Sequence, residues 1–481
     1  MKKITLLTFL FSSLFSFSQW NQIGLDIDGE NAGDESGTFI SINGDGTIIA
    51  IGEPRNDALA NNAGQVRVFE RNGSTWSQLG TDINASGNGD NFGQSIDINH
   101  NGDIIIVGAP GILAGPSAPG YARVFQWNGS NWIQRGTDIT GEAADDSCGS
   151  SVAINNDGSI IAVGASSNSG NQSFAGHVRI FQWNGTNYSQ LGNDIDGEAA
   201  QDFSGGSIDL SASGTTIAIG AAGNDGGGTT SGHIRVYNWN GSSWIQKGID
   251  IDGGGINSNF GSSVAIDGSG NTITSGAFSF SNGALGSTLV FSWNGSSWTQ
   301  KGSVLTGDVG SDFFGTSTSL SNDGNIIAIG ALGYARIFNF NGTDWLQEGS
   351  DILQENSLDQ FGRSISLNNN GSIVAIGTPY NDGNGIDAGH VRIFENTSLS
   401  NLTFENLSIS FYPNPTNDFL KVSSSETVEK VTVYNLIGQE VFSQQINSND
   451  FKIDVSNQAS GTYIAKINSK GKSQSIKLIK L

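Results

Sequence analysis

The stretch WSQLGTDINASGNGDNFGQSIDINHNGDIIIVGAPGILAGPSAPGYARVFQWNGS, residues 76–130, decides the fold because its pattern recurs along the chain. It contains four short β-forming segments: W-x-Q-x-G, then F-G-x-S-I-x-I, then an apolar run ending in G-A-P, and finally Y-A-R-V-F. The second segment alternates apolar with polar residues, and the third is almost wholly apolar, as in a strand covered on both faces. Asn- and Gly-rich turns separate the segments. The unit therefore predicts a small antiparallel sheet of four strands.

Every segment of this unit occurs seven times. The aromatic openings are Trp20, Trp76, Trp132, Tyr188, Trp244, Trp298 and Trp345, and the first four intervals are each 56 residues. Four-stranded units repeated at about this length are typical of a β-propeller. We predict an all-β protein: a seven-bladed β-propeller of four-stranded blades, followed by a small C-terminal β-sandwich.

The phase of the repeat predicts how the ring closes. Each tryptophan segment should pair with the V-R-V-F segment before it, as the outer strand of that blade. Trp20 has no preceding partner, and the last blade, which ends at Phe394, has no following tryptophan segment. The strand Trp20–Ile27 should therefore complete the seventh blade, which removes the exposed sheet edges of an open ring.

The N-terminus predicts export. Met1-Lys2-Lys3 is basic, residues 4–17 are apolar, and the run ends in Ser16-Phe17-Ser18. A short basic start, a short apolar run and small residues at the cleavage point describe a secretory signal peptide. We predict a signal peptide over 1–18, the propeller over 19–396, a linker over 397–406 and a second domain over 407–481.

The second domain differs in composition from the repeats: lysine increases and tryptophan is absent. It contains F-Y-P-N-P from Phe411, V-Y-N-L-I-G-Q from Val433, G-T-Y from Gly461 and a lysine-rich end. In this order the motifs resemble the type A sorting domain of the type IX secretion system of Bacteroidota. The resemblance implies passage across the outer membrane, with residues 407–481 contacting the secretion machinery, and a product that is released or attached to the cell surface.

The repeats resemble FG-GAP repeats, the blades of integrin α-subunit propellers and of many bacterial surface proteins. The motif is clearest at Phe92-Gly93 and Gly108-Ala109-Pro110. Many blades of that family carry a D-x-D-x-D-G calcium loop between their first two strands. The corresponding turns here, such as residues 99–102 and 211–214, lack the paired carboxylates that calcium needs, so that site is not carried over.

Charge and cysteine content exclude several classes of function. The net charge is -23, and the segment 20–406 alone carries -27. Nucleic acid and anionic lipid need Lys and Arg to neutralise phosphate, so neither is expected as a partner. One cysteine excludes a disulfide framework. We expect a monomer without a transmembrane segment.

Acidic loops between each outer strand and the next blade are the candidate site. By strand order they share a face with the variable loops after G-A-P, such as residues 110–119, 168–175 and 380–388. Oxygen-rich loops of this kind could bind Ca²⁺, and solvated turns with surface charge are the alternative. The calcium candidates are Asp26, Asp28, Glu30, Asp34, Asp194, Asp196, Glu198 and Asp202.

The remaining conspicuous residues are more consistent with structural roles. His177, His233 and His390 occupy one repeat position, and Cys148 replaces the Phe of an F-G motif, as a packed core thiol would. The ten tryptophans fall at two repeat positions, which favours packing between blades over a sugar-stacking platform.

We therefore predict a non-enzymatic binding or adhesion protein whose loop face recognises a glycan or a protein. The alternatives are an enzyme acting on polysaccharide, which would need carboxylates converging in the central cleft, and a surface scaffold without a discrete ligand.

Overall fold

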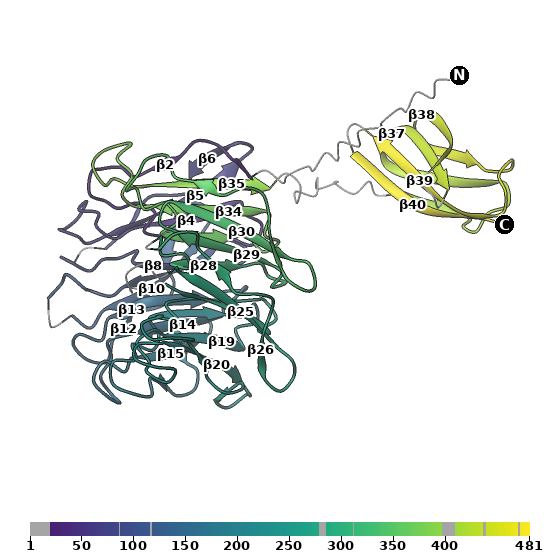
Figure 1. Cartoon of the computed structure of the whole chain (residues 1–481). Helices are drawn as coiled ribbons and strands as arrows, with labels where there is room; N and C mark the ends of the chain where they lie inside the picture. The colour runs from purple at the N-terminus through teal and green to yellow at the C-terminus, as the bar shows by residue number, and fades with distance from the viewer. Residues whose placement is uncertain are drawn as a thin grey trace, which may run out of the picture. The chain divides into compact units, whose positions relative to one another are not determined.

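The computed structural model describes residues 20–85, 87–115, 118–278, 285–310, 312–396, 409–435, 439–469 and 472–481 (Figure 1). The predicted signal peptide and linker lie outside the described residues. The chain divides into two compact units, residues 1–399 and 400–481. Among the residues that the structure describes, no helix is long and apolar enough to cross a membrane.

The first unit consists of seven antiparallel sheets, which confirms the predicted fold class. The innermost strands are β3 (Phe39–Ile42), β8 (Ser95–Ile98), β13 (Cys148–Ile154), β18 (Ser207–Leu210), β23 (Ser263–Ile266), β28 (Ser317–Leu320) and β33 (Ser364–Leu367). The second strands are β4 (Ile48–Glu53), β9 (Ile104–Ala109), β14 (Ile160–Ala165), β19 (Thr216–Ala221), β24 (Thr272–Ala277), β29 (Ile326–Ala331) and β34 (Ile373–Thr378). The third strands are β5 (Gln65–Asn72), β10 (Tyr121–Trp127), β15 (His177–Trp183), β20 (His233–Trp239), β25 (Ser287–Trp293), β30 (Tyr334–Phe340) and β35 (His390–Asn396).

The outer strand of each blade is divided into two short pieces that both pair with the third strand. A glycine with positive φ, such as Gly24 or Gly80, lies between the pieces. The pieces are β6 (Thr75–Gln78) with β7 (Ile83–Asn84), β11 (Trp132–Gln134) with β12 (Ile139–Thr140), β16 (Tyr188–Gln190) with β17 (Ile195–Asp196), β21 (Trp244–Gln246) with β22 (Ile251–Asp252), β26 (Trp298–Gln300) with β27 (Leu305–Thr306), β31 (Trp345–Gln347) with β32 (Ile352–Leu353), and β1 (Trp20–Gln22) with β2 (Ile27–Asp28).

The N-terminal strand closes the ring as predicted. Trp20 lies opposite Asn396 and Gln22 opposite Phe394, so β1 is the outer strand of the blade built from β33, β34 and β35. In Figure 1 the purple β2 and β5 accordingly lie beside the green β35. The innermost strands β3 and β33 are also neighbours, which joins the first and last blades.

Three repeated sets of hydrogen bonds hold the blades together. Six outer-strand indoles (Trp20, Trp76, Trp132, Trp244, Trp298, Trp345) donate to a carbonyl of the preceding blade's outer strand, over 2.7–3.1 Å. Five inner-strand serines (Ser95, Ser151, Ser263, Ser317, Ser364) donate to the F-G glycine carbonyl of the next blade. The inner turns form a closed cycle of backbone bonds through Gly44, His100, Asn156, Ala212, Gly268, Asn322, Asn369 and again Gly44.

The core of each blade lies around its second strand and the F-G aromatic residue. Phe92, Phe260, Phe314 and Phe361 are fully buried between neighbouring blades. Cys148 occupies the same place and is also fully buried, and burial raises the pKa of its thiol to about 11. The thiol is therefore neutral at physiological pH, as expected of a packed core residue.

The second unit is a small all-β domain. It consists of β36 (Ile409–Tyr412), β37 (Phe419–Asn435), β38 (Glu440–Asp454), β39 (Gly461–Ser469) and β40 (Lys472–Lys480), joined in one antiparallel sheet. The register between β37 and β38 shifts near Ser423 and Val428. Buried residues such as Val422, Ile453 and Leu478 form its core. The predicted sandwich thus takes the form of one curled sheet.

Candidate functional site

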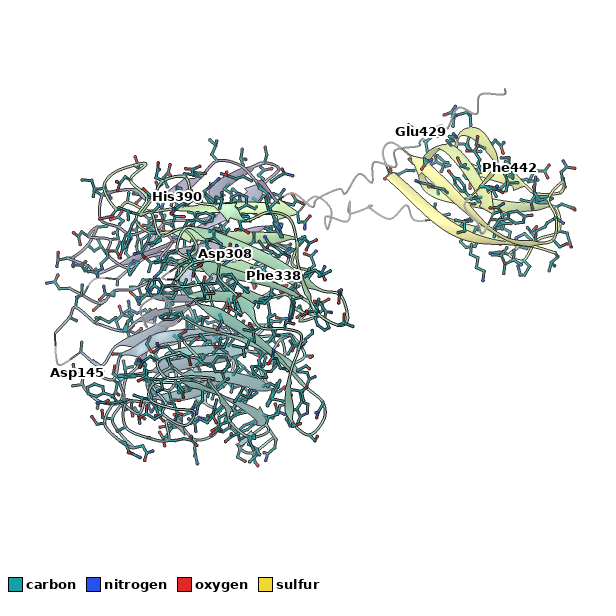
Figure 2. All side chains as sticks on the ribbon, in the orientation of Figure 1. Asp145, Asp308, Phe338, His390, Glu429 and Phe442 are labelled. Carbon is teal, nitrogen blue, oxygen red and sulfur yellow. The ribbon has the colours of Figure 1, made fainter. Side chains whose placement is uncertain are left out.

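Two sets of loops pair with each other on one face of the propeller. We call loop face the loops from each outer strand to the next innermost strand, together with the loops from each second strand to its third strand. Backbone N–H groups of the first set donate to carbonyls of the second across four blade boundaries: Glu35 to Asp387, Asn91 to Asn62, Phe203 to Phe174, and Asn259 to Thr230. Asp145, in one of these loops, lies at the margin of the propeller in Figure 2. The predicted sharing of one face is therefore correct.

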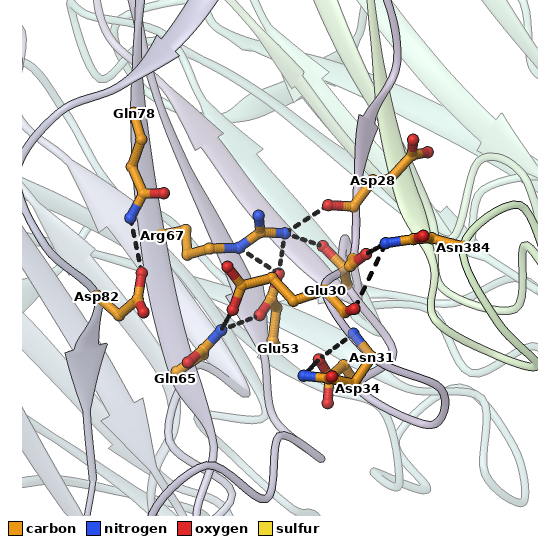
Figure 3. A network of polar contacts seen from close by, with 12 residues as sticks. Asp28, Glu30, Asn31, Asp34, Glu53, Gln65, Arg67, Gln78, Asp82 and Asn384 are labelled. Atoms are coloured by element: carbon orange, nitrogen blue, oxygen red, sulfur yellow. Dashed lines mark hydrogen bonds and ion pairs between the residues drawn. The ribbon is translucent and has the colours of Figure 1, made fainter.

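The acids of this face surround a buried arginine in the first blade (Figure 3). Arg67, on β5, bonds the carboxylate of Glu53, with Nε 2.8 Å from Oε1, and donates through Nη2 to the carbonyl of Asp28 at 2.7 Å. The Gln65 amide bonds both Glu53 and, at 3.3 Å, Glu30 from the loop of the neighbouring blade. A charged pair this deep is stable only when its partners are complete.

The same arginine recurs in five other blades, with acids as partners. Arg123 forms a two-pronged pair with Asp138 at 2.9 Å, and Arg336 bonds Asp351 and Asp308. Longer contacts join Arg179 to Glu142 and Arg235 to Glu198, both at 3.7 Å, and Arg392 to Glu355 at 3.6 Å and Asp26 at 3.8 Å. In four of these five blades one acid comes from the preceding blade's loop, so these pairs join neighbouring blades, whereas Arg123 pairs with Asp138 of its own blade.

The fifth blade shows that the arginine and its acids form one unit. Leu289 stands at the arginine position, Val304 replaces the outer-strand aspartate, and Gly254 replaces the glutamate of the preceding loop. All three charges are lost together. This joint replacement favours a structural ion-pair role for the acidic loops.

Three blades place a histidine within this arrangement. His177 Nδ1 lies 3.8 Å from Asp194 and 3.9 Å from Glu142, and His390 Nδ1 lies 3.5 Å from Asp26. Within the described part of the chain, three groups could hold a metal ion: Asp26 with Glu355 and His390, Glu142 with His177 and Asp194, and Glu198 with His233 and Asp250. Burial lowers the pKa of each histidine, and the adjacent arginine lowers it further, against the neighbouring acids.

The donor atoms of these groups suit a neutral histidine that faces acids better than they suit a calcium ion. Calcium prefers oxygen ligands alone, whereas imidazole suits transition metals. A ligating histidine normally donates its other ring N–H to an acceptor, yet Nε2 of His177 and His233 is buried without a partner among the described residues. An arginine (Arg179, Arg235 or Arg392) also lies beside each group, and its positive charge opposes a metal ion there. The geometry fits a neutral imidazole with its proton on Nδ1, facing the acids.

The predicted calcium residues separate into different roles. Asp34 and Asp202 are buried and accept backbone N–H bonds within their own loops. Asp26 and Asp194 accept from Gln22 and Gln190 at 2.6 Å and face histidines. The carbonyls of Asp28 and Asp196 accept from Arg67 and Arg235, and Glu30 and Glu198 reach the next blade.

The structure thus groups acids from consecutive loops, whereas we expected groups within one loop. Sequence reasoning missed Glu142, Asp250 and Glu355 as partners of the histidines. The sequence signal that could have found them is the joint replacement of the arginine, the aspartate and the glutamate in the fifth blade, by Leu289, Val304 and Gly254. Calcium binding by the eight residues stays a prediction.

Two carboxylates line the central channel among the residues that the structure describes. A cavity of about 450 Å³ is lined by the innermost strands, among them Asp97 and Asp209. Burial raises the pKa of Asp97 to about 6 and that of Asp209 to about 8. Asp97 accepts from Ile154 N at 2.8 Å, and Asp209 from Ile266 N at 2.7 Å.

These bonds give the channel carboxylates a structural role. The N–H groups of the innermost strands face the channel, where no further strand pairs with them. In two other blades a serine hydroxyl accepts such an N–H bond in place of a carboxylate: Ser319 accepts from Leu367 N and Ser366 from Ile42 N. Each acceptor joins its blade to the next one around the ring.

The loop face also exposes large apolar side chains that the ion pairs do not use. They are Leu59, Ile112, Leu113, Phe174, Phe203, Ile256, Leu285, Val309, Leu358 and Ile386. Leu358 is 87% exposed and Ile386 is 73% exposed. Exposed apolar groups gathered on one face of a rigid scaffold are a common feature of interaction surfaces.

Comparison with known families identifies the C-terminal unit. Residues 410–481 match the family model described as a secretion system C-terminal sorting domain. The predicted sorting domain is confirmed. The protein is thus a cargo of the type IX system, exported across the outer membrane to the cell surface or beyond.

The remaining comparisons concern the whole chain. No curated protein matches it. A solved structure of a candidate 6-phosphogluconolactonase from Bacteroides uniformis shares 12% identity, with a TM-score of 0.47, and the match covers 66% of this chain and 85% of that one. The propeller assignment here follows from the strand pairing of this chain alone.

Proposed function

We propose that the propeller is a non-enzymatic extracellular binding module that recognises a protein partner through its loop face. The observation that carries this proposal is the set of ten exposed apolar residues described among the acids of that face. Eight of the ten are aliphatic. Sugars stack on aromatic rings, whereas exposed apolar groups rimmed by polar residues mark protein-interaction surfaces. The resemblance to FG-GAP propellers of surface proteins agrees with this role.

The acidic surround indicates the kind of partner. The segment 20–406 carries a net charge of -27. A partner with basic and apolar surface would be attracted over a distance and then held by the apolar anchors. The ion pairs between blades keep the loops rigid, so binding would order few groups.

A defined array of extracellular proteins and glycans tests the proposal with the mature chain. Leu358→Ser/Ile386→Ser removes two anchors from the loop face. Ile133→Ser/Leu346→Ser is the matched control, since these residues are 53% and 55% exposed on outer strands. We expect binding to one or more proteins, weakened at least about ten-fold only by the loop-face variant. Binding to glycans alone, or equal loss in both variants, would contradict the proposal.

A further inference from the structure

One apolar pair on the loop face departs from the pattern of the repeats. At four blade boundaries, a residue of the second-to-third-strand loop pairs through its carbonyl with the N–H of the residue just before the F-G motif. Three of these pairs are polar: Asn62 with Asn91, Thr230 with Asn259, and Asp387 with Glu35. At the boundary of the third and fourth blades the pair is Phe174 with Phe203.

Both phenylalanines have a backbone conformation that suits them poorly. Phe174 has φ 52° and Phe203 has φ 54°, and the corresponding residues at the other three boundaries also have positive φ. Asn and Asp tolerate this left-handed region, whereas it is an outlier for a bulky residue. The backbone requirement therefore does not explain phenylalanine at these positions.

Burial does not explain the phenylalanines either. Phe174 is 43% exposed and Phe203 is 41% exposed, with ring centroids 6.2 Å apart and ring planes inclined by 37°. A Cβ at Gly223 would meet the backbone carbonyl oxygen of Gln201 at 2.1 Å and the Phe203 ring at 2.9 Å, so this ring packs beside the glycine. Two exposed rings at strained positions form an apolar feature that folding does not use.

The acidic residues near Phe174 and Phe203 favour a positively charged ligand. Residues 194–203, which lead to Phe203, contain four acids and no basic residue. The carbonyl of Glu198 accepts from Gln172, which is two residues from Phe174, so this acidic loop lies against the loop of the first ring. Burial raises the pKa of Glu198, Arg235 lowers it, and the neighbouring Asp250 and Asp202 raise it again, so acids outnumber the basic residue around this carboxylate.

We propose that Phe174 and Phe203 form the anchor for a basic side chain of the partner, an arginine guanidinium stacked on the rings beside the acids of residues 194–202. This inference rests on the proposed function, since it names the partner chemistry of the loop face. A guanidinium combines a flat surface that stacks on aromatic rings with a charge that carboxylates attract. The chain uses the same contact internally, where Arg235 lies 5.7 Å from the Tyr237 ring.

Three model peptides test the inference by fluorescence anisotropy with the mature chain in 0.15 M salt. Their sequences are four repeats of Gly-Arg-Leu, the same peptide with citrulline for Arg, and the same peptide with Asp for Arg. Citrulline keeps the planar shape and removes the charge. The variants are Phe174→Asn and Phe203→Asn, which copy the first-blade pair and change no charge. Ile245→Asn on β21, also exposed, is the control.

We expect the arginine peptide to bind at least about ten-fold more tightly than the other two. Each Phe→Asn variant should weaken that binding about ten-fold, whereas Ile245→Asn should leave it unchanged. Thermal midpoints of both Phe variants should equal or exceed that of the wild type, because Asn tolerates positive φ. A lowered midpoint would overturn the inference, since it would assign the rings to folding.

Failure of the inference is distinguishable from failure of the proposed function. If no peptide binds, if citrulline binds as well as arginine, or if the Phe variants bind like the wild type, the anchor is refuted. Protein binding on the array that depends on Leu358 and Ile386 but not on the phenylalanines would keep the proposed function and remove this anchor. Loss of glycan binding alone in the Phe variants would assign the pair to sugars instead, and would also refute it.

Discussion

Replacing Arg67 should destabilise the propeller in a manner that depends on pH. Arg67 pairs with Glu53, whose side chain is 0% exposed, and Arg67→Leu leaves that carboxylate without its charge partner. Removing one member of a buried pair typically costs about 3–5 kcal/mol. The remaining carboxylate can also take up a proton, which limits the penalty. From an ordinary pKa of 4.5, protonation costs about 3.4 kcal/mol at pH 7 and about 0.7 kcal/mol at pH 5.

The double variant Arg67→Leu/Glu53→Ala is the matched control. It copies the fifth blade, where Leu289 and Ala277 occupy these positions without charge. We expect it to lie within about 1 kcal/mol of the wild type, since replacing a whole buried pair is often nearly neutral.

Equilibrium unfolding in urea at pH 5 and pH 7 measures both variants. Burial raises the pKa of Glu53, and loss of Arg67 raises it further, so the deficit of Arg67→Leu should grow as pH rises. A deficit that is equal at both pH values, or a double variant as unstable as the single one, would refute the ion-pair reasoning.

Three further perturbations test the boundaries between blades. Because burial raises the pKa of Asp209 to about 8, the stability that this carboxyl contributes should fall by up to about 1.4 kcal/mol per pH unit between pH 5 and 8; the stability of Asp209→Asn relative to the wild type should rise with that slope in a series of melts. His177 has a lowered pKa in the folded state, so its contribution is lost as pH falls below about 6.5. His177→Gln, which copies Gln65, should have a higher melting temperature relative to the wild type at pH 5 than at pH 7; an equal difference at both pH values would count against the neutral imidazole. Trp132→Phe deletes the indole bond to Leu79 and should lower the unfolding free energy by about 1 kcal/mol in urea, with Ile133→Ser as the control.

The sequence predicted the fold well because seven copies of one unit act as an internal alignment. Spacing alone indicated the number of blades, and the unpaired Trp20 segment indicated how the ring closes. The division of each outer strand was not predicted, because it depends on a positive-φ glycine whose effect is visible only in the strand pairing. The curled sheet of the C-terminal unit likewise depends on register shifts within long strands.

The candidate site was predicted only in part, because its contacts cross from one blade to the next. Asp194 and Glu198 lie in one loop, yet Asp194 faces His177 and Glu198 faces Arg235 of the following blade. Reasoning within one loop could not separate them. The tryptophans were interpreted correctly as packing residues, since repetition itself indicates a structural role in every blade.

Repetition therefore also provides a criterion for function. A residue type that recurs in most blades, such as the arginine of the third strand, satisfies a requirement that every blade has. The acids of the loop face meet that description once their arginine partners are counted. Phe174 and Phe203 do not, because the equivalent pairs at three other boundaries are polar, and Phe313 is the one other phenylalanine described at such a position. A departure that is strained, exposed and apolar is expected where selection acts on binding, and for this reason the phenylalanine pair, more than the numerous acids, carries our inference about the partner.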